Sequence, residues 1–201
     1  MTSDTITIQN LISAIIGGLL VIIGQLITEY LKSKKERREK IIFLASKSKE
    51  IEQHLFNDLR ELAMFKTHAN YWWFCHIKST IGSEYSKRYY DEHLRSQTEC
   101  RISEKSIGAR IAQYFGIVNE FLTLASSDTV GIISDLELIK KIHFRKAVDY
   151  DINDDYDEIR NKKIENDEIQ LKNEYWNLLK PISKINNKLY NESKKLAKYK
   201  I

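Results

Sequence analysis

The stretch that decides the architecture is Leu11-Ile-Ser-Ala-Ile-Ile-Gly-Gly-Leu-Leu-Val-Ile-Ile-Gly-Gln-Leu-Ile27. It lies within Thr5 to Thr28, a segment without a single charged residue. As a helix this segment extends about 36 Å, at about 1.5 Å per residue, and the hydrocarbon core of a bilayer is about 30 Å thick. A cleavable signal peptide would need basic residues before the apolar run, but the only early charge is Asp4. The sequence therefore predicts one uncleaved transmembrane anchor at 1–28.

A basic juxtamembrane segment follows the anchor at 29–40. Its cations are Lys32, Lys34, Lys35, Arg37, Arg38 and Lys40, and no Lys or Arg precedes the apolar run. Cations close to a membrane helix stay on the side where they need not be translocated. We therefore expect the N-terminus outside and the remaining residues, 41–201, in the cytoplasm as one helical domain.

Small residues recur within the apolar run, at Ser13, Ala14, Gly17, Gly18 and Gly24. Small residues four or seven apart let two membrane helices approach closely, and this packing drives their association. The pattern favours a homo-oligomer, although small-residue pairs also arise by chance in membrane helices.

Composition limits the fold class and the partners. The chain has 201 residues, with 32 Lys and Arg against 28 Asp and Glu, so its formal net charge of +4 is too small for a histone-like polybasic protein. Seven Gly and one Pro disfavour a β architecture with many turns. The two cysteines are too few for a disulfide scaffold and fit a reducing compartment.

Apolar residues at intervals of three and four predict a long helix from Ile41 to His76 with coiled-coil-like packing. Ser48 and Asp58 interrupt the stripe. Its members are Ile41, Leu44, Ile51, Leu55, Leu62, Phe65, Ala69 and Trp72.

Two more helices are predicted before residue 126. One begins near Ser83 and runs through Arg95, and the other covers Ile107 to Ala125. Turn-forming residues at 126–131 predict a loop. Ser134-Asp-Leu-Glu137 has the spacing of a capping box, which predicts the start of a short helix that ends near Ala147.

The C-terminal part is expected to be an acidic connector at 149–158 and a long helix over 155–199. One side of this helix carries Ile159, Trp176, Leu179, Ile182, Ile185, Leu189 and Leu196. Pro181 should kink or break it near Lys180, because proline lacks an amide donor and clashes with the preceding turn. The predicted fold is therefore an all-α helical bundle behind a single transmembrane helix.

The densest aromatic cluster is Tyr71, Trp72, Trp73 and Phe74. Aromatic side chains at a helix end usually belong to a core. Trp and Tyr also dominate protein-binding hot spots, so the same cluster is a candidate partner surface.

Arg88 and His93 have the Arg-x4-His spacing that resembles a class of small helical ribonucleases, the higher-eukaryote-and-prokaryote nucleotide-binding class. His can move protons near neutral pH and Arg stabilises phosphoryl charge, so the pair has suitable chemistry. Both residue types are common enough here for a match by chance, and Tyr89 stands where that class usually has a small polar residue. The alternative is an ordinary surface arginine and histidine.

Two charged features have structural and functional interpretations. Glu120 follows Asn119 in an otherwise apolar turn, so we expect it to be buried and paired with a Lys or Arg of a neighbouring helix. The helix after Lys180 carries its lysines opposite an apolar side, which favours contact with an anionic membrane over nucleic acid, with plain solvated lysines as the alternative.

No metal site, cofactor or enzymatic motif is predicted. His68 and His76 are eight residues apart, about 12 Å along a helix, which is too far to share one zinc ion. The chain has no Gly-rich phosphate loop, nucleophile elbow, paired-Cys motif or HExxH. We therefore expect a protein that is not an enzyme.

Three sequence pieces resemble a bacterial family of unknown function: Tyr114-Phe-Gly-Ile-Val-Asn-Glu-Phe121, Gly131-Ile-Ile-Ser-Asp135 and Trp176-x-x-Leu179-x-Pro181-Ile182. Ser134 interrupts the Gly-Ile-Ile-Asp wording of that family. The resemblance implies an inner-membrane protein with one N-terminal membrane helix and a cytosolic helical domain, sometimes associated with antiviral defence. It brings no catalytic residues.

Three functional hypotheses follow. The first is a membrane-anchored interaction and assembly protein that acts with an unknown protein partner at the cytoplasmic face of the inner membrane. The second is an effector of an anti-phage defence system that disrupts the membrane when its Gly-bearing helices assemble. The third is a ribonuclease that uses Arg88 and His93.

Overall fold

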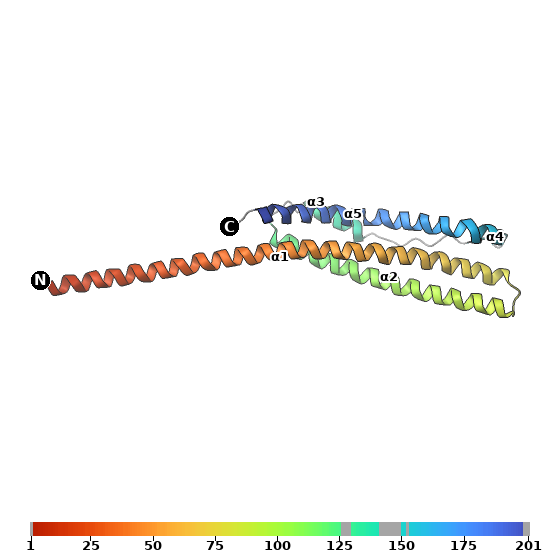
Figure 1. Cartoon of the computed structure of the whole chain (residues 1–201), viewed down its shortest axis with the longest axis horizontal. Helices are drawn as coiled ribbons and strands as arrows, with labels where there is room; N and C mark the ends of the chain where they lie inside the picture. The colour runs from red at the N-terminus through yellow and green to blue at the C-terminus, as the bar shows by residue number, and fades with distance from the viewer. Residues whose placement is uncertain (1, 126–129, 141–149, 152, 199–201) are drawn as a thin grey trace.

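The computed structural model describes residues 2–125, 130–140, 150–151 and 153–198, and within these ranges all regular structure is helical (Figure 1). The elements are α1 (Thr2–Lys78), α2 (Glu84–Leu124), α3 (Val130–Lys140), α4 (Tyr156–Glu158), a π-helical turn η1 (Ile159–Lys163) and α5 (Ile164–Lys198). The all-α prediction is confirmed for these residues.

Helix α1 joins the predicted anchor, the basic segment and the first bundle helix into one uninterrupted helix of 77 residues. Burial begins at Ile41, which is 2% exposed. From there six positions of the predicted stripe are buried: Ile41, Leu44, Ile51, Leu55, Leu62 and Ala69. Phe65 and Trp72 are only half-buried, since the stripe drifts off the core side over a straight helix.

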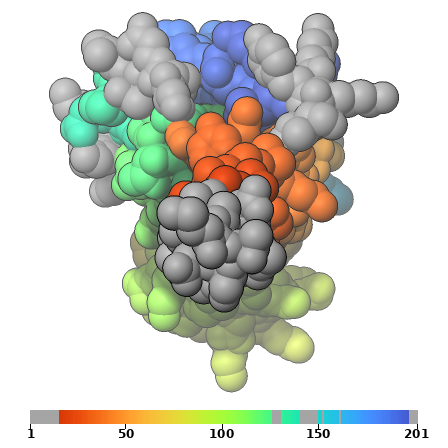
Figure 2. Space-filling view, turned by 90° about the vertical axis from the view of Figure 1, so that its left-hand side faces the viewer, coloured from red at the N-terminus to blue at the C-terminus, as the bar shows by residue number. Residues whose placement is uncertain are grey.

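The bundle is an elongated arrangement with α1 in the middle. Helix α2 packs along one side of α1 and α5 along another, and both run back toward the N-terminal end (Figure 1). Seen from that end, orange α1 lies in the middle, with blue α5 above it and yellow-green α2 below (Figure 2). Among the described residues, the core positions of α1 all lie from Ile41 on.

The turn between α1 and α2 explains where the second helix starts. Gly82 has a φ of 84°, a left-handed conformation that costs glycine little. Ser83 then caps α2, because its Oγ accepts a hydrogen bond from the Ser86 amide at 3.1 Å. The predicted start near Ser83 is confirmed.

The two helices predicted between residues 83 and 125 are a single helix, α2, which corrects the sequence analysis. The apolar pattern is missing in the middle because the residues that face α1 there are Ser96 and Ser103, which are 8% and 9% exposed. Small side chains allow close approach without an apolar stripe. Beyond them the buried positions are apolar, at Ile107, Tyr114, Val118 and Phe121.

Helix α3 also begins earlier than predicted. It starts at Val130, so Ser134 lies inside the helix and its Oγ donates to the Gly131 carbonyl at 3.3 Å instead of capping an amide. The capping-box prediction is therefore wrong. Most of the predicted loop at 126–131 and the predicted helix end near Ala147 lie outside the described residues.

The last helix confirms the predicted start at 155 and corrects the predicted break. Asp155 caps α4 by accepting a hydrogen bond from the Asp157 amide at 2.8 Å, and η1 joins α4 to α5. Helix α5 continues through Pro181 without interruption. Buried Leu179 and Ile182 hold both sides of the proline against the bundle, and this packing outweighs the missing hydrogen bond.

Candidate functional site

From Ile16 to Leu31, α1 buries none of its large apolar side chains against other residues that the structure describes. Its large apolar side chains between Ile16 and Ile27 are 50 to 64% exposed, the range set by Ile23 and Leu20. A Cβ built on Gly17, Gly18 or Gly24 would meet no atom of the described residues within 4 Å. The helix is long and apolar enough to cross a membrane, and none of its most apolar window is buried.

The predicted packing residues share this open part of the helix. At 3.6 residues per turn, Ser13, Gly17 and Gly24 lie within about 40° of one another, and Ala14 and Gly18 lie about 100° further round. The small residues therefore form two adjoining strips along α1. A second helix could approach either strip closely.

The basic segment is partly used inside the molecule, which the sequence analysis missed. The Arg37 Nε donates to the Leu124 carbonyl at 2.6 Å, so a residue of the juxtamembrane segment caps the C-terminal end of α2. The Lys40 Nζ lies 2.6 Å from the Glu120 carboxylate. Lys35 pairs with Glu39 on its own helix at 3.9 Å. Lys32, Lys34 and Arg38 lie on the same segment of α1, and the first two are exposed.

The prediction for Glu120 is wrong about burial and right about pairing. Its side chain is 45% exposed, so it is not a buried carboxylate in an apolar turn. It is nevertheless paired with a lysine of a neighbouring helix, Lys40. The apolar residues around it point to the core, while the helical period turns Glu120 to the rim.

The aromatic cluster is split between core and surface. Tyr71 and Phe74 are 8% and 1% exposed, and they pack with Tyr150 and Ile159 in a second small core. Burial raises the pKa of the Tyr71 hydroxyl far above its usual value, and the hydroxyl lies 3.2 Å from that of Tyr156. These two residues are thus unavailable to a partner.

Trp72 and Trp73 occupy the outer side of the cluster. Trp72 is half-buried and stacks on Tyr89, with the ring centroids 5.8 Å apart. Trp73 is 44% exposed and lies between two imidazoles, 5.4 Å from His76 and 5.1 Å from His93. The predicted partner surface is therefore reduced to these two indoles.

Arg88 and His93 do not converge. Five residues apart on α2, they point about 140° away from each other around the helix. The His93 Nδ1 lies 2.8 Å from the Ala69 carbonyl, which it reaches as a donor, and its ring packs against Trp73. This geometry gives the imidazole a structural role between α1 and α2, and the ribonuclease hypothesis gains no support from it.

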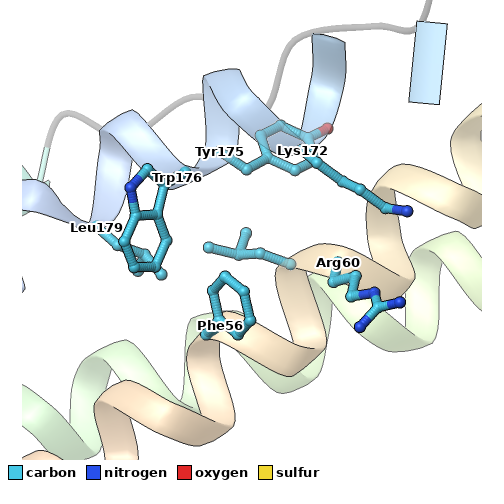
Figure 3. Close-up of a pocket in the computed structure, with 7 residues that line it drawn as sticks. Phe56, Arg60, Lys172, Tyr175, Trp176 and Leu179 are labelled. Carbon is cyan, nitrogen blue, oxygen red and sulfur yellow. The ribbon is translucent and has the colours of Figure 1, made fainter. Parts of the chain in front are cut away.

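An apolar groove lies between α1 and α5, with a cavity of about 250 Å³ (Figure 3). Phe56 and Trp176 close one end, edge to face with ring centroids 5.1 Å apart, and are 43% and 50% exposed. Arg60 and Lys172 lie toward the other end, and Lys172 pairs with Glu168. The sequence analysis placed Trp176 on the buried side of the last helix, and the structure corrects this to the rim of the groove.

A buried polar network links the three long helices, and the sequence analysis did not find it. Glu52 of α1 is 7% exposed and accepts hydrogen bonds from Ser183, from the Asn186 Nδ2 at 2.8 Å and from the Lys49 Nζ at 2.7 Å. The Tyr114 hydroxyl of α2 donates to the Asn186 Oδ1 at 3.0 Å. Burial alone would raise the pKa of Glu52, but the hydrogen bonds outweigh it and hold that pKa below its usual value. The network fixes the register of the bundle.

A second buried carboxylate fastens α3 to α5. Asp135 is 4% exposed and receives the Lys184 Nζ at 2.9 Å and the Lys188 Nζ at 3.1 Å. Burial would raise the pKa of Asp135, but the two ammonium groups hold it below its usual value. Two of the C-terminal lysines are therefore structural.

Neither a metal nor a disulfide has a place among the residues that the structure describes. These residues contain no group of three or more His, Cys, Asp or Glu side chains that could hold a metal ion. Cys75 is buried and Cys100 is half-buried, and both are free.

Comparisons with protein families, with curated proteins and with solved structures found no match to this chain. The bacterial family inferred from the three short sequence pieces therefore stays a prediction.

Proposed function

We propose that the chain is a single-pass membrane protein whose helical bundle acts as an interaction and assembly module at the cytoplasmic face. One observation carries the proposal: the large apolar side chains from Ile16 to Ile27 are all exposed, and this part of α1 continues without a break into the central helix of the bundle. Exposed apolar side chains over this length are stable in lipid and unstable in water.

The orientation follows from charge. The twelve residues after the apolar run hold six Lys and Arg, and the residues before it hold none. Such asymmetry retains the basic side in the cytoplasm. The bundle would then stand on the inner surface, about 20 Å of helix separating Thr28 from the first buried residue, Ile41.

Assembly is assigned to the small-residue strips of α1. Two copies of the helix could pack backbone to backbone along Ser13, Gly17 and Gly24, because no side chain among the described residues covers this face at either glycine. The rigid connection to the bundle would then bring two bundles side by side. The unknown partner remains unassigned.

Extraction and topology test the anchor. Membranes that contain the full chain are washed with alkaline carbonate, and alkaline phosphatase or a fluorescent protein is fused to the C-terminus. We expect the chain in the pellet, with an inactive phosphatase and a fluorescent fusion. Release into the wash, or an active phosphatase, would overturn the proposal.

Cross-linking tests the assembly. We expect Gly17→Ile to reduce the cross-linked dimer of the full chain in membranes severalfold, because the added side chain separates the two helices. The matched control is Leu26→Phe, which adds bulk about 180° away around the helix. Only monomer in the unmodified chain, or equal loss in both variants, would refute self-association through these strips.

A further inference from the structure

At the end of the bundle that faces the proposed membrane, two segments far apart in the sequence come to the same level along α1. Helix α2 ends there, since Leu124 lies beside Arg37 and Glu120 beside Lys40. Figure 2 looks at this end and shows α1 in orange with blue α5 directly above it.

Contacts between α5 and α1 show which residues of the two helices lie side by side along the bundle. Asn186 lies beside Ser48, with its Nδ2 3.2 Å from the Ser48 carbonyl, and the two helices are antiparallel (Figure 1). Each residue further along α5 therefore corresponds to one residue back along α1. Lys194, eight residues past Asn186, is level with Lys40, eight residues before Ser48.

A collar of residues at this end carries a net charge equal to that of the whole chain. We define the collar as residues 29–40 of α1, residues 190–198 of α5 and Glu120. Its cations are Lys32, Lys34, Lys35, Arg37, Arg38, Lys40, Lys194, Lys195 and Lys198, and its carboxylates are Glu29, Glu36, Glu39, Glu120 and Glu192. Nine cations against five carboxylates leave an excess of four, which equals the formal net charge of the full chain, +4. The remainder of the chain is thus neutral on balance.

Several of these cations point to solvent. Lys194 is exposed and lies over the Tyr190 ring, 4.5 Å from its centroid, and Lys195 has a side chain that is 69% exposed, paired with Glu192. Lys32, Lys34 and Lys35 are exposed on α1. Arg37 and Lys40 are engaged with α2, so they hold the end of the bundle in place beside the exposed lysines.

The collar is also at the right height. Arg37 lies nine residues past Thr28, about 14 Å along the helix. The headgroup layer accounts for about 6 Å of this length. The remaining distance is about 8 Å at Arg37 and about 12 Å at Lys40, the level of Lys194, and the Debye length at physiological ionic strength is about 8 Å. The collar therefore lies within about one and a half Debye lengths of the surface, where an anionic membrane still attracts it.

We infer that the collar binds the headgroups of anionic phospholipids and docks the end of the bundle on the membrane. This inference rests on the proposed transmembrane anchor, which keeps the collar at the surface. It goes beyond that anchor because it assigns a lipid class and adds the end of α5, residues 190–198, to the membrane contact, more than 150 residues after the span.

The full chain in lipid nanodiscs tests the inference. One set of discs is zwitterionic and one contains about a third anionic phospholipid, and both carry a headgroup quencher. A fluorophore is attached at Asn191→Cys, an exposed position on α5. The native thiols label poorly, because burial raises the pKa of Cys75 and raises that of Cys100 to about 11.

We expect at least about twofold more quenching in the anionic discs, lost when salt is raised from about 0.1 M to 1 M. Lys194→Glu with Lys195→Glu should remove the difference between the two lipids. The matched control is Arg101→Glu with Lys105→Glu, an equal change of charge at exposed positions of α2 far from the collar, and it should keep the difference.

Equal quenching in both lipids, or the same loss in both double variants, would overturn the inference while leaving the anchor intact. A chain that fails to enter the discs at all would instead refute the proposed function. The two failures are therefore distinguishable.

Discussion

The two halves of α1 have the same secondary structure and opposite environments. From Ile16 to Leu31 the large apolar side chains are all exposed, whereas from Ile41 on one apolar side of the helix is buried in the core that α1 shares with α2 and α5. Leu26 is 60% exposed and Leu55 is 0% exposed, although both are leucines of one continuous helix. One continuous helix therefore carries two kinds of apolar surface, and the residues around each leucine decide whether it lies in the protein core or is left exposed on the helix.

The largest expected effect is on membrane insertion, and it comes from substitutions in the first half of α1, before residue 41. Leu19→Arg with Ile22→Arg should prevent membrane insertion, because each arginine at the centre of a span costs about 2.5 to 3.5 kcal/mol. We expect the variant to leave the membrane pellet after fractionation. Leu94→Arg with Ile102→Arg, at exposed positions of α2, is the matched control and should remain in the pellet. A double-arginine span that still resists carbonate would contradict the assignment of lipid to this half.

In the second half of α1, a substitution that leaves a cavity in the core should lower the stability of the bundle. Leu55→Ala is expected to destabilise the bundle by about 2 to 5 kcal/mol, since the side chain is fully buried and the site cannot collapse completely. Chemical denaturation in detergent, followed by circular dichroism, measures the change. Leu26→Ala should alter the same transition by no more than about 0.5 kcal/mol. Similar losses from both leucines would mean that the halves are not distinct.

The buried carboxylate sharpens the comparison further, because it gives the second half a pH dependence. The pKa of Glu52 is lowered in the folded state, so its contribution to stability is complete above the unfolded value of about 4.3. This contribution is lost as the pH falls through the folded pKa. Glu52→Gln should cost about 1 to 2 kcal/mol at pH 7.

Unfolding curves between pH 7 and pH 3 measure this effect. The difference between the unmodified chain and Glu52→Gln should shrink as the pH falls. Glu61→Gln, an exposed change on the same helix, should follow the unmodified chain at every pH. A difference that is constant with pH would show that the charge of Glu52 is not what matters.

The smallest expected effect lies at the boundary between the halves. Arg37→Ala removes the hydrogen bond to the Leu124 carbonyl and should cost about 0.5 to 1 kcal/mol. Hydrogen exchange should speed up in the last turn of α2 and stay unchanged in the turn at 79–83. Lys34→Ala, on the same segment, should leave both unchanged, and a uniform increase along α2 would argue against a local cap.

Much of the fold could be predicted, because the spacing of apolar residues indicates the core side of each helix and capping residues indicate where helices begin. The stripe after Ile41 and the apolar side of the last helix show which residues form the core, and Ser83 and Asp155 mark two helix starts. The middle of α2 could not be predicted, since Ser96 and Ser103 bury little apolar surface and leave no period. The effect of Pro181 also depends on packing that only the assembled bundle supplies.

The site was less predictable, because its key contacts join distant residues. The basic run after the span could be found from the sequence alone, but the partner of Arg37 lies 87 residues away. Ser48 interrupts the apolar stripe, which was the one visible sign of the network formed by Glu52, Tyr114 and Asn186. The sequence of the aromatic cluster did not show which of its residues belong to the core and which to the surface. The helical period decides this, because it buries Phe74 and leaves its neighbour Trp73 exposed.

The unbroken course of α1 makes the molecule a lever. About 75 Å of helix lies between Thr28 and Lys78, so a tilt of about 10° at the bilayer would swing the far tip, with Trp73 and its two histidines, through about 13 Å. A change in membrane thickness or in the packing of neighbouring spans would thus be magnified at the opposite end of the bundle. A partner held at that tip would register events in the lipid without touching it.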